Sequence, residues 1–236
     1  MLDSTVSRVP FSTLWRADQK LWRDFSPSQV YGEGNLFGRK SHAMKKMKKI
    51  FARFVRILTA PPIFAALLCV FLYLLLPGSF ASPVHFALAL GFLTGLPLLA
   101  YPISALIPAL RRKGRDGQRD LAVVFSVIGY VGGFLYALLF DGAATELVLY
   151  GTYVLSGLAI GVGTLAGFKI SGHACGCSGP LAMLATFVSP WFLAGYCLLP
   201  FIFWSSRCLG RHSAAQLLTG AALPVLAMVL CRVAFL

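Results

Sequence analysis

Long runs without any Asp, Glu, Lys or Arg are the feature that most limits how this chain can fold. The longest run extends from Ile57 to Leu110, and four further runs lie at Leu121–Phe140, Leu147–Phe168, Ile170–Ser206 and His212–Cys231. A helix of about 20 apolar residues crosses the hydrocarbon core of a bilayer, so each run can hold at least one crossing. The sequence therefore predicts an all-α, multi-spanning helical membrane bundle of about six to seven helices.

Composition agrees with a membrane protein. Hydrophobic residues make up 58% of the chain and charged residues only 12%, whereas soluble domains carry about 25% charged residues. The six cysteines fall mostly within the apolar runs, where cysteine packs as a small hydrophobic residue. Their placement does not indicate the disulfide framework of a secreted domain.

The positive charge is concentrated at the start of the chain, because twelve of the 21 Lys and Arg residues precede Ile57. A basic segment next to a membrane helix binds anionic lipid headgroups, and we favour that partner over nucleic acid. We expect two parts, a basic amphipathic tail over 1–57 and a transmembrane domain over 58–236. The apolar residues of 11–25 fall near one helical face, as in a helix lying in the membrane surface. Basic residues next to a membrane span mark its cytoplasmic side. We therefore expect the tail on the cytoplasmic face of a cell membrane, bacterial or equivalent.

One apolar run is too long for a single crossing. From Ala174 to Trp204 a continuous helix would measure about 46 Å, against a hydrocarbon core of about 30 Å. Ser189-Pro190 lies at its midpoint, and proline interrupts a helix because it lacks an N–H donor. We therefore predict a short helical hairpin of two helices, 174–188 and 191–206. The other predicted spans are 58–77, 85–109, 121–140, 146–168 and 213–235.

With this hairpin, three polar clusters lie on the same face of the membrane. They are RRKGRDGQRD (111–120), KISGH (169–173) and SSRCLGRHSAAQ (205–216). Together they contain two histidines, several arginines and few acids, an inventory that suits a phosphate group. One histidine can attack phosphorus while the other protonates the leaving oxygen, and guanidinium groups can balance the charge without a metal.

These clusters resemble the motifs of the type-2 phosphatidic acid phosphatase superfamily, the membrane phosphatases related to vanadium haloperoxidases. Ser171-Gly172-His173 is similar to the centre of the family's P-S-G-H motif, with Ile170 in place of proline. Ser206-Arg207 followed by His212 resembles its S-R-x5-H-x3-D motif, although only four residues separate Arg207 from His212. Arg112 and Arg119 have the spacing of the K-x6-R-P motif, with Arg in place of Lys.

The resemblance implies a role for each matching residue. His212 would be the nucleophile and His173 the general acid, and no cofactor or metal would be needed. Gln216 stands where the family has the aspartate that orients the nucleophile, and its amide oxygen can accept the same hydrogen bond without supplying charge. The implied phosphate-binding residues are Arg207, Arg119, Arg112, Lys169, Ser171 and Gly172.

The implied substrate is a lipid phosphate of the phosphatidic acid, phosphatidylglycerol phosphate or polyprenyl diphosphate type. A second hypothesis is a non-enzymatic protein that binds or transports a soft metal. His173, Cys175 and Cys177 form an H-x-C-x-C pattern with ligands that suit copper or zinc. A structural membrane protein without catalytic activity is the third.

Overall fold

The computed structural model of the chain describes residues 36–236, and it describes side chains from Met44 onward except those of Arg115, Asp116 and Arg119. The predicted surface helix within 11–25 lies outside the described residues. The chain divides into two compact units, Met1–Lys48 and Lys49–Leu236. The described part of the first unit is helical.

The described chain is built from helices, most of which begin at a proline or a capping residue. A proline occupies the first or second position of α3, α4, α5, α6 and η3, where its missing N–H costs no hydrogen bond. The elements are α2 (Leu36–Leu58), α3 (Pro61–Leu75), α4 (Pro83–Leu90), the π-helical turn η2 (Gly91–Gly95), α5 (Leu96–Leu106), α6 (Pro108–Arg112), α7 (Arg115–Leu139), α8 (Ala144–Leu165), α9 (Gly172–Phe187), the 3-10 segment η3 (Pro190–Cys197), α10 (Leu198–Cys208) and α11 (Ala214–Phe235).

Among the described residues, five helical segments are long and apolar enough to cross a membrane. They are Met44–Leu75, Pro83–Leu106, Asp120–Leu139, Ala144–Leu165 and Ala214–Phe235. The chain is therefore a multi-pass membrane protein with an all-α fold, as predicted. The segment that contains α4 and α5 is interrupted by the π-helical turn η2, and Pro102 lies within α5.

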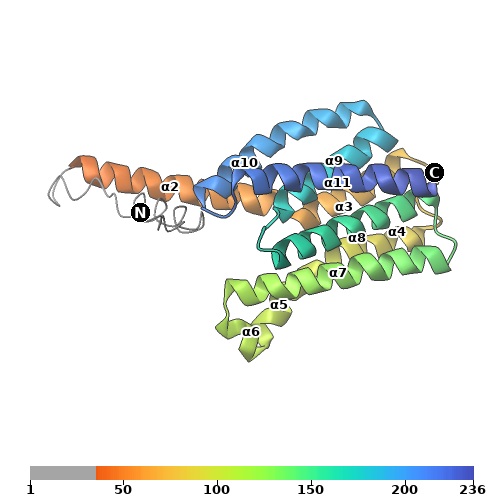
Figure 1. Cartoon of the computed structure of the whole chain (residues 1–236), viewed down its shortest axis with the longest axis horizontal. Helices are drawn as coiled ribbons and strands as arrows, with labels where there is room; N and C mark the ends of the chain where they lie inside the picture. The colour runs from red at the N-terminus through yellow and green to blue at the C-terminus, as the bar shows by residue number, and fades with distance from the viewer. Residues whose placement is uncertain (1–35) are drawn as a thin grey trace, which may run out of the picture. The chain divides into compact units, whose positions relative to one another are not determined.

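The predicted helical hairpin is present. α9 ends at Phe187, and the chain reverses at Val188 and Ser189 before η3 and α10 return along α9. Ser189 caps η3, because its Oγ accepts a hydrogen bond from the Trp191 N–H at 3.4 Å. Figure 1 shows the two arms of the hairpin side by side, with α11 beside them. The hairpin brings the chain back to the end of the bundle at which α9 begins.

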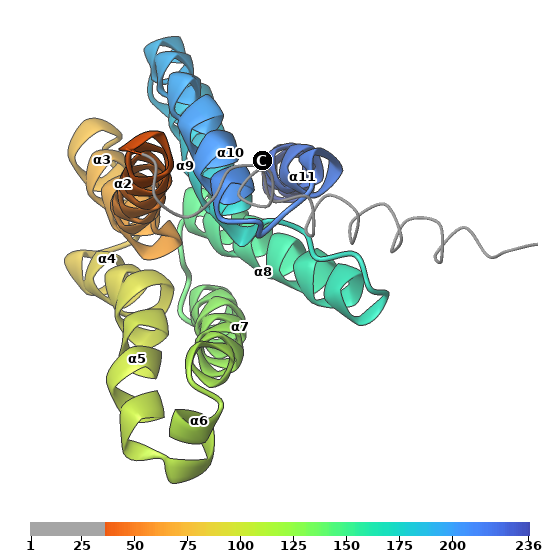
Figure 2. The ribbon, with the colours of Figure 1, turned by 90° about the vertical axis from the view of Figure 1, so that its left-hand side faces the viewer.

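Alternating crossings give the second unit two distinct ends. We call the end at which α9 begins and α10 ends the histidine end, because it carries His173 and His212. The opposite end, where α4 and α8 begin and α11 finishes, is called the C-terminal end. In Figure 2 the histidine end faces the viewer, with α9, α10 and α11 grouped together and α6 on the far side of α7 from them.

The packing of α9 and α11 in the core of the second unit fixes the position of the histidine end. α9 packs against α3 and α11, and α11 also packs against α8. Gly220 of α11 lies against the backbone of Ser171, and a Cβ at this position would come within 2.5 Å of the Ser171 carbonyl oxygen. A glycine is therefore required for α11 to approach the start of α9 this closely.

Candidate functional site

His173 is the second residue of α9, and the local sequence places it there. Ser171 is the N-cap of α9: its Oγ accepts a hydrogen bond from the Ala174 N–H at 3.3 Å. The Ser171 N–H donates to the Gln216 carbonyl oxygen at 3.0 Å, which ties the start of α9 to α11. The N–H groups of Gly172 and His173 lie in the first turn, where a helix has no preceding carbonyls to accept them and where anions bind.

Arg56 of α2 contacts the His173 ring. Its Nη2 lies 3.1 Å from His173 Nδ1, and its Nη1 donates to Ser206 Oγ at 2.9 Å. A guanidinium has only donors, so His173 Nδ1 must be the acceptor and the ring proton must lie on Nε2. The contact therefore assigns His173 as the neutral Nε2–H tautomer.

The surroundings of His173 oppose its protonation. Burial of the ring and the positive charge of Arg56 lower the pKa of His173 from 6.5 to about 3, and His212 and Arg211 act in the same direction. A hydrogen bond with the backbone of Arg56 acts in the opposite direction but is outweighed. The ring is neutral at neutral pH in the absence of an added negative charge.

His212 has the other tautomer. Its Nδ1 lies 3.1 Å from the carbonyl oxygen of Lys169, which can only accept, so the ring proton lies on Nδ1. The lone pair is then on Nε2, as nucleophilic attack requires. His212 follows the irregular turn after α10, in which Gly210 has a φ of 61°. Because α10 ends at Cys208, the shortened spacing between Arg207 and His212 falls in a turn rather than in a helix.

Gln216 caps the start of α11 together with Ser213. Its Oε1 accepts from the Ser213 N–H at 3.0 Å, and its own N–H donates to Ser213 Oγ at 3.3 Å. These reciprocal bonds form a capping box at the start of α11. The acceptor beside His212 Nδ1 is the Lys169 carbonyl oxygen.

The structure brings the two histidines to one end of the bundle but leaves other predicted site residues apart. His173 and His212 are close enough for the charge of one to affect the other. The Lys169 and Arg207 side chains are exposed at the same end. Arg112 is exposed at the end of α6, which Figure 2 shows on the far side of α7 from α10. The Arg119 side chain lies outside the described residues.

Two serine side chains at the histidine end, those of Ser171 and Ser206, make hydrogen bonds within the protein. Both are fully buried, and their hydroxyls accept hydrogen bonds from α9 and from Arg56, respectively. Sequence reasoning assigned Arg56 to the lipid-facing basic tail and missed its contact with His173. The signal that could have found it is the position of Arg56 at the boundary between the basic segment and the first apolar run.

No group of three or more His, Cys, Asp or Glu residues among those described could hold a metal ion. Cys175 and Cys177 are buried in α9, and the adjacent His173 faces a guanidinium through Nδ1. A cation beside this nitrogen would be repelled by Arg56. The arrangement therefore fits an anion better than a metal.

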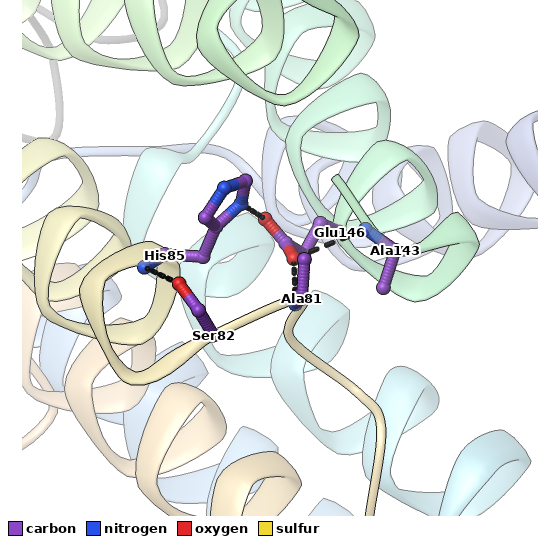
Figure 3. A network of polar contacts seen from close by, with 5 residues as sticks. All are labelled: Ala81, Ser82, His85, Ala143 and Glu146. Atoms are coloured by element: carbon purple, nitrogen blue, oxygen red, sulfur yellow. Dashed lines mark hydrogen bonds and ion pairs between the residues drawn. The ribbon is translucent and has the colours of Figure 1, made fainter. Parts of the chain in front are cut away.

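A second polar cluster lies at the C-terminal end (Figure 3). Glu146 is 1% exposed, and its Oε2 accepts from His85 Nδ1 at 2.7 Å while its Oε1 accepts from the N–H groups of Ala81 and Ala143. His85 itself follows the N-cap Ser82. Sequence reasoning did not single out this pair, although His85 is an isolated titratable side chain within one apolar run and Glu146 directly precedes another.

Comparison of the chain with protein-family models, with curated proteins and with solved structures finds no match.

Proposed function

We propose that the chain is an integral membrane lipid phosphatase that acts through a phospho-histidine intermediate. The observation that carries this proposal is the pair of histidines at one end of the bundle with complementary tautomers. His212 has its Nδ1–H directed to the Lys169 carbonyl and its lone pair on Nε2, whereas His173 has its proton on Nε2. A nucleophile and a proton donor are the two groups that phosphoryl transfer through histidine requires.

The reaction that follows has two steps. In the first, His212 Nε2 attacks phosphorus, the bond from phosphorus to the lipid oxygen breaks, and the leaving oxygen takes a proton from His173 in its imidazolium form, which the bound phosphate stabilises and which returns to the neutral ring. In the second, water attacks the phospho-histidine, His173 takes the water proton, and inorganic phosphate leaves with His212 restored. Arginine side chains and the N–H groups at the start of α9 stabilise the charge on the phosphoryl oxygens.

The position of the site favours a lipid substrate. Arg56 lies about 20 residues before the end of α3, and a helix of that length matches the thickness of the hydrocarbon core. Arg56 and His173 therefore lie at the depth of the lipid headgroups. The resemblance to type-2 phosphatidic acid phosphatases supports the same substrate class, with phosphatidic acid and polyprenyl diphosphate as the first compounds to test.

The test is release of inorganic phosphate by purified protein in detergent micelles from a panel of lipid phosphates and diphosphates, with and without EDTA. We expect EDTA-resistant release that His212→Ala and His173→Gln abolish. Arg232→Ala is the control, because this exposed arginine lies near the C-terminal end. Full activity in both histidine variants would refute the mechanism, and activity that EDTA removes would favour a metal-dependent one.

A further inference from the structure

Arg56 joins three helices at the histidine end. From α2 it reaches Ser206 of α10 through Nη1 and His173 of α9 through Nη2. Ser206 is fully buried, so its contact with Arg56 holds the guanidinium in a defined position against α10. A planar guanidinium carries five N–H donors, and the same group can bind an oxyanion with two parallel hydrogen bonds.

The charge around His173 comes from more than one element. Arg56 faces it from α2, and Arg211 and His212 face it from the turn between α10 and α11. All three disfavour the imidazolium form of His173. A group in this state is a poor proton donor until a negative charge arrives beside it.

We propose, on the basis of the function proposed above, that Arg56 is a phosphate-binding residue whose Nη2 moves from His173 Nδ1 to a phosphoryl oxygen when substrate binds, which lets His173 take up a proton at Nδ1. The phosphoryl group brings the negative charge that stabilises the imidazolium. It also accepts the Arg56 Nη2–H that had been directed at His173 Nδ1. His173 then becomes a proton donor only when a phosphate is in the site. Arg56 supplies the guanidinium that the resemblance had assigned to the cluster at 111–120.

The kinetic test compares Arg56→Ala, Arg56→Lys and Arg53→Ala on the same lipid phosphate. Arg53 is one turn earlier on α2 and its side chain is exposed, so its replacement removes the same charge outside the site. We expect Arg56→Ala to lower kcat/KM by about 100- to 1000-fold, the usual effect of removing one donor to a transition-state oxyanion. Arg56→Lys should recover part of this loss, and Arg53→Ala should stay within about twofold of wild type. Equal activity in all three variants would overturn the proposal.

A second measurement does not depend on turnover. Protein labelled with 15N in its histidine rings is titrated with inorganic phosphate in micelles, and His173 is identified by the signals missing from the His173→Gln variant. Wild type should show His173 as the Nε2–H tautomer without phosphate and as imidazolium when phosphate is bound. In Arg56→Ala the pKa of His173 should be higher without phosphate, because the positive charge of Arg56 is gone. The variant should also bind inorganic phosphate with an affinity about 10-fold lower than that of wild type.

The two measurements separate this inference from the proposed function. If activity requires His173 and His212 but neither activity nor the ring signals depend on Arg56, the inference fails and the phosphatase stands. If wild type releases no phosphate from any lipid but binds inorganic phosphate in an Arg56-dependent way, the phosphatase fails and the anion site stands. An unchanged His173 signal in Arg56→Lys and Arg56→Ala, each checked for folding by gel filtration, would overturn the inference.

Discussion

The Glu146 carboxylate gives the sharpest stability prediction, because it is almost completely buried and accepts three hydrogen bonds. Replacing Glu146 with Ala removes the acceptor of three donors: the buried His85 Nδ1–H and the part-buried N–H groups of Ala81 and Ala143. An unsatisfied buried donor costs about 1 to 3 kcal/mol, and removing one partner of a buried pair costs about 3 to 5 kcal/mol. We therefore expect Glu146→Ala to lower the free energy of unfolding by about 3 to 5 kcal/mol.

The assay is thermal unfolding of the purified protein in detergent micelles. For a chain of this size, 1 kcal/mol corresponds to a shift of about 2 to 4 °C, so Glu146→Ala should lower the midpoint by about 6 to 20 °C. Glu146→Gln keeps one oxygen acceptor and places an NH2 group in the site. It should cost less, about 1 to 3 kcal/mol.

Asp141→Asn is the matched control. Asp141 is an exposed carboxylate in the turn between α7 and α8. Its φ is 52°, a positive value that Asn also adopts readily. We expect a change of less than about 0.5 kcal/mol, as at other exposed positions. A Glu146→Ala midpoint within the range of this control would refute the view that the buried network fixes the C-terminal end. A double replacement with His85→Ala should cost less than the two single changes added together, because the two residues share one contact.

Three further predictions concern the histidine end. The pKa of His173 is about 3 in the folded state against 6.5 in the unfolded state, so its contribution to stability is present above pH 6.5 and is lost as the pH falls toward 3. By pH 5 the loss is up to about 2 kcal/mol. His173→Gln should therefore flatten this part of the curve of unfolding midpoint against pH. Gly220→Ala should cost about 1 to 3 kcal/mol and reduce phosphate release, because its Cβ would strike the Ser171 backbone, whereas Gly161→Ala, with open space around it, should be neutral or slightly stabilising. Ser213→Ala should cost about 1 kcal/mol in thermal unfolding through loss of the α11 cap, and an unchanged midpoint would contradict the capping role.

Much of the fold could be predicted because helix length and proline position are local properties of the sequence. The run from Ala174 to Trp204 exceeds the bilayer thickness, and Ser189-Pro190 offers one place to reverse, so the hairpin followed from two facts. The structure places that reversal at Val188 and Ser189.

The site was less accessible to sequence reasoning because its contacts are long-range. The contact between Arg56 and His173 joins residues 117 positions apart, and no spacing rule relates them. The capping of α11 by Gln216 is a local feature that the sequence allowed: a Ser three residues before a Gln at a helix start forms a capping box, in which the Gln oxygen accepts from the Ser213 N–H. The contact between His85 and Glu146 is also long-range, because it joins residues 61 positions apart.

The measurement that tests the central claim most directly is trapping of the phospho-enzyme. The purified protein is mixed with a phosphatidic acid labelled in its phosphate, denatured at alkaline pH to preserve phospho-histidine, and digested for mass spectrometry. We predict label on His212 in wild type, none in His212→Ala, and less label on His212 in His173→Gln, because formation of the intermediate needs the proton from His173. Phosphate release without label on His212, or label on another residue, would contradict the proposed mechanism.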